Sequence, residues 1–539
     1  MSSSLDALEG WSLPRLSEDW SLPHAGSTVL ALMSLLTLYT LLITIYNLTL
    51  HPLSSYPGPL LNRGTVLPLL LHETLGTTVH AWSALHAKYG PVVRISPNQL
   101  SYITPAAWRD IYGARTSSST VSTSGSSSSG EMAKEELIFP GTKFEFFHPY
   151  KPMISCDASN HARHRRAVGP AFSDRAVRGY ESVLDYYVNK LLDKLEHVDT
   201  QNRTEGQTGV NVVDWFHFCM FDITSHLVFG KSFGNLDREK YHAWVGRVFP
   251  GMKLIVWAGV VAAVPGLGRV VSWLIPQAVV DEARRHVEGI KNMVDERCGM
   301  ELKERDFMSH ILPNVGDKGL VRDELYLNAQ LLCIAGSETT ASLLAGTVYF
   351  LSRPENVRHR ERLARELTMQ FASEEEMTPG SLNQRAPFLA AVLNEGLRLY
   401  PPGAINMPRT VPAGGATIDG RYVPGGTVVG IAQFAAYRSP THWVDPLTFA
   451  PERWLPGEPG FQRYADDRRE AFKPFSSGPR NCVGQNLAVA ECRLIIARLF
   501  WRFDVQVLPG QERWIHQRTF LGWEKPPLRV CFQRRTEMS

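Results

Sequence analysis

The residues from Phe475 to Gly484 read Phe-Ser-Ser-Gly-Pro-Arg-Asn-Cys-Val-Gly and place one thiol, Cys482, just before an apolar, helix-like run. A helix N-terminus presents unpaired backbone N–H groups, and their positive potential favours the ionised thiolate. Gly478 and Gly484 let the backbone turn and pass close to a flat ligand without a Cβ clash. Arg480 lies two residues before the sulfur, where its guanidinium can reach a carboxylate. The loop therefore predicts a site that presents a thiolate to a ligand.

The spacing Phe-x-x-Gly-x-Arg-x-Cys-x-Gly resembles the heme-binding loop of the cytochrome P450 superfamily. The resemblance implies that Cys482 is the axial ligand of the heme iron and that Arg480 meets a heme propionate. It also assigns Phe475, Gly478 and Gly484 to the cofactor-binding loop. The alternative is a buried cysteine in a glycine turn, which leaves the matched spacing unexplained.

Length and composition bound the remaining possibilities. A chain of 539 residues exceeds the size at which one core usually stops growing, so length alone favours two or more domains. The family resemblance instead implies one mainly α-helical domain with small β-sheets, the cytochrome P450 fold. A hydrophobic content of 44% and a net charge of +3 fit a globular body and give no reason to expect nucleic acid as a partner. The 7 cysteines are widely spaced without a C-x-x-C pair, which fits a reducing compartment.

No charged residue or histidine occurs between Thr28 and Leu50, and this run is long enough to cross a bilayer as a helix. A cleavable signal peptide is disfavoured because its apolar region is usually only about 7 to 15 residues long; a buried core helix is the other alternative. Acidic residues outweigh Arg15 before the run, and Arg63 is the first full charge after it, which favours an extracytosolic N-terminus. We therefore expect an extracytosolic segment 1–27, a membrane anchor 28–50, a proline-rich linker 51–63 and a cytosolic catalytic domain 64–539. The resemblance places such a protein in the endoplasmic reticulum membrane as a single-pass protein.

The start of the body predicts a helix and a hairpin. His80 to Tyr89 reads as an amphipathic helix that Gly90 ends, and alternating strands follow at Val92–Ser96 and Gln99–Ile103. Residues 116–130 are almost all Ser, Thr and Gly, a composition that buries too little apolar area to fold. We expect a disordered surface insert there.

His161-Ala-Arg-His-Arg-Arg166 opens a helical segment that ends near Phe172. Its basic side either faces solvent or meets an anion, and the pattern alone favours solvent. The resemblance implies the second interpretation, because the segment matches a helix whose Trp-x-x-x-Arg pair donates to a heme propionate. His161 stands in the tryptophan position and Arg165 in the arginine position, and their i, i+4 spacing puts both on one face.

Residues 249–280 are unusually apolar, but Pro265 and Gly266 interrupt them. We interpret the run as too short and too broken for a second membrane span. It forms either the roof of a substrate pocket that touches the membrane surface or a plain core segment.

Asp323 to Phe350 reads as a long helix that contains the polar sequence Ala-Gly-Ser-Glu-Thr-Thr at 335–340. Gly336 removes side-chain bulk where a ligand could approach, and Thr339 can return its hydroxyl to a backbone carbonyl. A helix kink with a solvated Glu338 is the alternative. The sequence also resembles the oxygen-activation helix of the family, which implies that Thr339 and Glu338 bring protons to bound oxygen.

Glu395 and Arg398 lie at i and i+3 on one helix face and, in isolation, predict an ordinary surface pair. Together with Arg453 they resemble the family's Glu-Arg-Arg cluster, which locks the core behind the heme. Arg409 matches a position that reaches a propionate. The resemblance also implies substrate-facing positions, namely Ile405, Asn406, Met407, Phe520 and Leu521.

The resemblance runs from the anchor to about Val530 and implies a heme-thiolate monooxygenase with heme b as its cofactor. Such an enzyme inserts one oxygen atom from O2 into an apolar small molecule, with electrons that NADPH supplies through NADPH–cytochrome P450 reductase. The sequence is similar to fungal members, which suggests secondary metabolism and a terpenoid or polyketide substrate. A heme-thiolate isomerase or dehydratase and a non-catalytic heme-binding sensor are the alternatives, and Thr339 argues against both.

Overall fold

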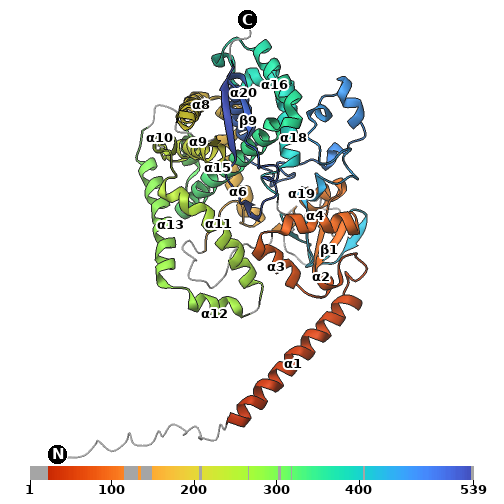
Figure 1. Cartoon of the computed structure of the whole chain (residues 1–539). Coiled ribbons are helices and arrows are strands. Elements are labelled where there is room, and N and C mark those ends of the chain that lie inside the picture. The colour runs from red at the N-terminus through yellow and green to blue at the C-terminus, as the bar shows by residue number, and fades with distance from the viewer. Residues whose placement is uncertain are drawn as a thin grey trace, which may run out of the picture.

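A computed structural model of the chain describes residues 22–535, with gaps at 115–130, 135–148, 205–208, 265, 302–304, 317–318 and 405–406. Helices dominate it and the β-sheets are small, which confirms the predicted fold class (Figure 1). The predicted insert at 116–130 lies outside the described residues, as do Ile405 and Asn406.

The α-helices of the described chain are α1 Leu22–Thr49, α2 Leu60–Gly64, α3 Leu67–Leu75, α4 Thr78–Tyr89, α5 Pro105–Tyr112, α6 Ala158–Val168, α7 Asp174–Arg178, α8 Glu181–Thr204, α9 Val212–Phe229, α10 Asn235–Arg238, α11 Ala243–Ala262, α12 Leu267–Leu274, α13 Gln277–Cys298, α14 Phe307–Ile311, α15 Arg322–Ser352, α16 Val357–Gln370, α17 Pro379–Arg385, α18 Pro387–Leu399, α19 Gln433–Ala436 and α20 Gln485–Arg502. The strands are β1 Val92–Ser96, β2 Gln99–Tyr102, β3 Ala133–Lys134, β4 Val210–Asn211, β5 Arg409–Thr410, β6 Ala416–Ile418, β7 Arg421–Val423, β8 Val428–Ile431, β9 Phe503–Val507, β10 Thr519–Phe520, β11 Gly522–Trp523 and β12 Arg529–Arg534.

Helix α15 is the central element of the helical part and matches the predicted long helix to within two residues at each end. It packs against α9, α18 and α20, and every residue from Thr340 to Ser352 is buried. Glu324 accepts the backbone N–H of Val321 and so satisfies an unpaired donor at the first turn. The helix ends just before Pro354, which cannot continue it.

The largest sheet has the strand order β1-β2-β8-β5-β3. The predicted hairpin is present as β1 and β2, and β2 then pairs in parallel with β8, with Gln99 opposite Val428. This sheet and α5 share one buried hydrophobic cluster, while the helices around α15 share a larger one. The body therefore has two packed regions, and the helical region is the larger.

Helix α1 extends away from the body (Figure 1). Three helices of the described chain are long and apolar enough to cross a membrane: Gly26–Thr49, Ala243–Ala262 and Arg322–Ser352. Most of the apolar stretch of the third is buried in the core, whereas no residue in the most apolar stretch of the first is buried. Our expectation that the apolar run after Phe249 is too short was wrong on length, because α11 begins earlier, at Ala243. One side of α11 nevertheless packs on α3 and β10.

The side of the body from which α1 extends also carries α2, α3, α11 and α12 (Figure 1). The indole N–H of Trp257 donates to the carbonyl of Thr74 at 3.1 Å and ties α11 to α3. Large apolar side chains are exposed on α3, α11 and α12: Leu67, Leu71, Leu75, Leu254, Ile255, Trp257, Val270, Trp273 and Leu274. Such a patch beside an apolar helix favours contact with a membrane surface.

The last turn of α1 is part of the body. The Asn47 amide donates to the carbonyl of Gly64 at 2.9 Å, and the buried Arg94 donates to the carbonyl of Asn47 at 2.8 Å. A deletion that removes Asn47 would therefore leave a buried guanidinium without one of its acceptors.

Glu395, Arg398 and Arg453 meet in the core, each with no exposed surface, so the surface-pair interpretation was wrong. Arg398 binds both oxygens of Glu395, at 2.7 and 2.9 Å, and Arg453 donates to one of them at 3.1 Å. Burial alone raises the pKa of Glu395, but the two guanidinium groups bring it below its ordinary value. Asp467, which the sequence did not single out, also pairs with Arg453.

Deleting residues 1–44 should remove stable membrane integration and leave the body folded, because Asn47 and its contacts to Arg94 are kept. Peripheral membrane binding through α11 and α12 should remain, and Trp273→Asp in the truncated protein should weaken it. Sedimentation with membranes before and after carbonate extraction measures both effects. Carbonate-resistant association of the truncated protein would contradict a single anchor.

Candidate functional site

The loop from Phe475 to Gly484 ends where α20 begins, as predicted, with Gly484 as the N-cap. The backbone N–H of Cys482 donates to the carbonyl of Phe475 at 2.9 Å and closes the loop. Gly478 has φ of +76°, and a Cβ there would lie 1.9 Å from the carbonyl oxygen of Tyr112, so only glycine fits. At Gly484 a Cβ would come no closer than 3.8 Å to another residue. Contacts within the protein therefore explain why residue 478 is glycine, but they do not explain why residue 484 is.

The thiol of Cys482 is exposed. Burial of the surrounding site raises its pKa, although the Gly484 N–H and the Arg165 guanidinium both lower it. The helix N-terminus therefore acts in the predicted direction, but desolvation outweighs it, which the sequence argument did not anticipate. A coordinated metal ion would ionise such a thiol outright.

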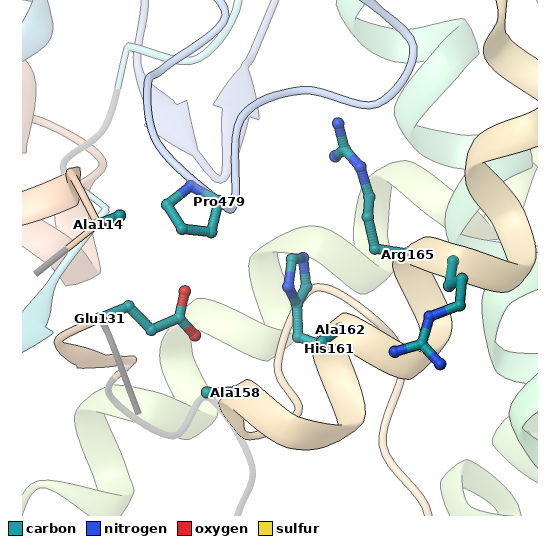
Figure 2. Close-up of a pocket in the computed structure, with 8 residues that line it drawn as sticks. Ala114, Glu131, Ala158, His161, Ala162, Arg165 and Pro479 are labelled. Carbon is teal, nitrogen blue, oxygen red and sulfur yellow. The ribbon is translucent and has the colours of Figure 1, made fainter. Parts of the chain in front are cut away.

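Helix α6 supplies one wall of a cavity of about 520 Å³ next to this loop. The helix begins at Ala158, three residues before the predicted start, because the Asp157 carboxylate accepts the N–H groups of Ser159 and Asn160. Figure 2 shows His161 and Arg165 on the side of α6 that faces Pro479 of the loop, with the Glu131 carboxylate across from them. The basic side of the helix thus faces the cavity and not solvent alone.

The arginines around this cavity bind the loop and its neighbours. Arg165 donates to the backbone carbonyl of Asn481 at 2.6 Å and to its side-chain oxygen at 2.9 Å. Arg480 pairs with Glu131 at 2.7 Å and donates to the carbonyl of Cys156 at 2.9 Å. Its remaining nitrogen, Nη1, is buried and has no partner among the described residues. The guanidinium of Arg409 lies 4.9 Å from the ring centre of Tyr112.

Five basic residues gather in this region, and we call them the cation group: Lys134, His161, Arg165, Arg409 and Arg480. Burial and the charges of neighbouring members lower the pKa of Lys134, His161 and Arg409. Burial and the charges of Arg480 and Arg165 lower the pKa of His161 to about 4. Burial and the charges of Arg409 and Arg480 lower the pKa of Lys134 to about 7. Glu131 is the only carboxylate that pairs with Arg480 in the described chain. Such an excess of buried positive charge fits a ligand that carries carboxylates.

The polar sequence in α15 exposes Ala335 and Thr339, which are four residues apart on one face of a mostly buried helix. The Thr339 hydroxyl donates to the carbonyl of Ala335 at 2.6 Å, the hydrogen bond that the sequence predicted. A Cβ on Gly336 would lie 3.0 Å from the methyl group of Thr224 on α9. The close packing of α9 and α15 is therefore one structural reason for this glycine.

The kink alternative predicted a solvated Glu338, and that prediction was wrong because Glu338 is buried. Its carboxylate lies 2.8 Å from Nε2 of His217 on α9 and also pairs with Lys525, which follows β11. Burial raises the pKa of Glu338, but Lys525 and His217 outweigh burial and bring it to about 2. Sequence reasoning missed both partners, since no local pattern links three segments so far apart in the chain.

The predicted substrate-facing residues do not all meet. Phe520 lines a second cavity, of about 320 Å³, together with Glu338, His217 and Lys525. Leu521 has φ of +67° at the turn between β10 and β11. Met407 is 40% exposed and is not part of that cavity's lining.

Comparisons with known proteins agree with the geometry. The family model for cytochrome P450 matches residues 57–532. Cytochrome P450 monooxygenase aclL of Aspergillus oryzae is 38% identical over 496 residues, which cover 92% of this chain and 96% of that protein. Cytochrome P450 monooxygenase atr2 of Stereocaulon alpinum is 37% identical over 508 residues, which cover 93% of this chain and 94% of that protein. The chain therefore belongs to the cytochrome P450 family, and its activity is that of a monooxygenase.

Proposed function

We propose that this monooxygenase inserts one atom of O2 into an apolar small molecule of fungal secondary metabolism, a terpenoid or a polyketide. NADPH supplies the electrons through NADPH–cytochrome P450 reductase. The observation that carries the proposal is an exposed thiol at the start of α20 beside a buried cation group with too few counter-charges. The similarity to monooxygenases of Aspergillus and Stereocaulon supports the same conclusion.

The residues of the site fit heme, the cofactor that the family implies. Cys482 offers an exposed sulfur, and the unpartnered Nη1 of Arg480 offers a buried donor for a carboxylate. No neighbouring residue restricts Gly484, so the missing side chain there leaves room beside the sulfur. Cys482 would ligate the iron, and Arg165, Arg409 and Arg480 would bind the propionates, with His161 beside them.

When bound, the heme activates O2, and its cysteine thiolate pushes electron density that favours O–O cleavage. The protein's part is to exclude water, to hold the substrate and to deliver protons. The hydrogen of the Thr339 hydroxyl is used by the Ala335 carbonyl, so its oxygen is left as an acceptor that can hold a water or another proton donor. Glu338, one residue earlier, is the nearest carboxylate in sequence, and once protonated it can supply such a proton.

The same proposal covers location and domain organisation. Residues 1–27 lie outside the cytosol, 28–50 anchor the chain in the endoplasmic reticulum membrane, 51–63 link the anchor to the body, and 64–539 form the catalytic domain. The exposed apolar stretch of helix α1 and the exposed apolar patch on α3, α11 and α12 support this arrangement. A membrane-bound reductase would then reach the cytosolic face of the body.

Cys482→Ala should abolish the thiolate-type absorption of the reduced carbon monoxide complex, because Cys482 is the only cysteine in the loop. Cys531→Ala, on β12, is the matched control and should keep the parent spectrum. An unchanged spectrum in the Cys482 variant would contradict the assignment of the ligand.

Thr339→Val keeps the side-chain shape but removes the hydroxyl. With purified reductase and a substrate found by mass spectrometry of products from a host fed candidate precursors, product formed per NADPH should fall. The fall should be at most the ~10²- to 10⁴-fold typical of a lost proton-transfer group. NADPH consumption should fall much less, and hydrogen peroxide should rise.

Thr347→Val is the matched control for this experiment. Thr347 lies on the same helix, and its buried hydroxyl has no partner among the described residues, so the ratio of product to NADPH should not change. An isomerase, a dehydratase or a sensor would consume no NADPH at all. An unaltered ratio in the Thr339 variant would mean that protons arrive without this hydroxyl.

A further inference from the structure

Glu338 is the end of a chain of hydrogen bonds that begins near the surface. The hydroxyl of Tyr241 lies 2.7 Å from Oδ1 of Asp214 and 3.1 Å from Nδ1 of His217. Nε2 of His217 then lies 2.8 Å from Oε2 of Glu338. Asp214 and His217 are on α9, Tyr241 precedes α11, and Glu338 is on α15. Three consecutive contacts thus connect a partly exposed carboxylate to the residue before Thr339.

This chain of hydrogen bonds needs one proton more than its four groups carry when both carboxylates are ionised and the imidazole is neutral. Each of the three contacts needs one hydrogen between its heavy atoms. Tyr241 supplies one and a neutral imidazole supplies one, while ionised Asp214 and Glu338 supply none. The third hydrogen is therefore an extra proton. It resides on His217 as an imidazolium, or on one of the two carboxylates.

Lys525 fixes the inner end of the chain. Its ammonium group pairs with Oε1 of Glu338 and donates to the hydroxyl of Ser342 at 2.9 Å and to the carbonyl of Trp523 at 3.3 Å. These three acceptors use all its hydrogens. With His217 as an imidazolium, the charges of His217 and Lys525 balance those of Asp214 and Glu338. The extra proton therefore makes these four groups neutral overall. That balance is what a low-dielectric site requires.

The surroundings make the extra proton easy to release. His217 is only 3% exposed, and the ring of Phe249 lies 5.0 Å from its imidazole. Burial lowers the pKa of His217 below its ordinary value, although Glu338 and Asp214 act in the opposite direction and Lys525 adds to the lowering. Lys253 and Glu524, which pair with each other, are the other charged groups that line this cavity. Because Tyr241 and Glu338 contact opposite ring nitrogens of His217, a proton that arrives at one nitrogen can be matched by release from the other.

We propose that Asp214, Tyr241, His217 and Glu338 conduct a proton from the edge of this cavity to α15, next to Thr339. The inference rests on the proposed function, because it assigns the source of the protons that O2 reduction consumes. The transfer is balanced at each contact. The Asp214 carboxyl gives its proton to the Tyr241 oxygen, Tyr241 gives its own to Nδ1 of His217, and Nε2 gives one to Glu338. No electron moves, and each O–H or N–H bond that breaks is replaced by one that forms.

Arrival of the proton also changes what holds Glu338. A neutral carboxyl group loses its ionic attraction to Lys525, so its flexible side chain becomes free to turn away from α9. Asp214, Tyr241 and His217 are in this view positioning and proton-carrying residues. They act through Glu338 and need not touch the substrate or the cofactor.

Tyr241→Phe interrupts the chain of hydrogen bonds between Asp214 and His217. Its effect on the protonation of His217 is measurable without any turnover. The substitution removes the acceptor of the Nδ1 hydrogen, so His217 should change from imidazolium to neutral imidazole at a lower pH than in the parent. Solid-state NMR of the full-length, ¹⁵N-histidine-labelled protein in lipid, as the reduced carbon monoxide complex, follows this change. The signal is assigned by its loss in His217→Gln.

Tyr187→Phe is the matched control, because Tyr187 contacts Nδ1 of His226, also on α9, at 3.0 Å and has no part in the chain. With purified reductase and no added substrate, the hydrogen peroxide formed per NADPH should rise toward one in Tyr241→Phe and stay at the parent value in Tyr187→Phe. Asp214→Asn, which keeps hydrogen-bonding capacity but removes the outer carboxylate, should raise the ratio as well. It replaces Tyr241→Phe if that variant does not fold.

The outcomes distinguish a failure of the proposed function from a failure of the proposed proton conduction. A parent that consumes no NADPH even with reductase and substrate would refute the proposed function, while the His217 titration would still decide whether the extra proton exists. A His217 that is neutral at every pH in the parent, with neither carboxylate protonated by infrared spectroscopy, would overturn the proton count. A shifted titration with an unchanged peroxide ratio would overturn conduction.

Discussion

Buried positive charge is the constraint on which this structure depends. Arg398 and Arg453 lie entirely inside the protein, and Glu395 and Asp467 compensate them with direct hydrogen bonds. The cation group around α6 and the Cys482 loop is different. Within the described chain, Glu131 is the only carboxylate that pairs with Arg480, and one donor nitrogen of Arg480 has no partner. An uncompensated buried charge is strongly destabilising. The second set therefore favours a bound anion, and the carboxylates of a heme would supply that charge.

Helix α15 divides the chemistry between two of its faces. Thr339 is exposed on one face, and Glu338, its neighbour, points into the buried contact with α9 and Lys525 on another. The close approach of α9 at Gly336 brings His217 within reach of Glu338. In the proposed proton transfer, the packing of these two helices places His217 as the donor next to Glu338 as the acceptor. The C-terminal hairpin adds Lys525, and a Cβ on Gly522 there would come 3.1 Å from the Glu338 oxygen.

Local sequence predicted local structure well. The glycine and arginine loop, the N-terminus of α20, the long helix α15 and the hairpin of β1 and β2 all follow from short-range patterns of capping, periodicity and turn residues. The Thr339 hydrogen bond spans four residues and was equally predictable. The direction of Glu338, the role of Gly336 and the pairing of Arg453 with Asp467 depend on contacts between distant segments, which no local pattern encodes. Burial also raises the pKa of Cys482, and burial is a property of the whole fold that local sequence does not encode.

A crystal structure of the full chain with its heme would show directly which group binds Arg480. We expect that Nη1 of Arg480 donates to a heme carboxylate and that the Cys482 sulfur is bonded to the iron. We also expect that Arg165 or Arg409 contacts one of the two carboxylates. A structure in which Arg480 binds only Glu131 and Cys156, with both heme carboxylates in solvent, would contradict these expectations.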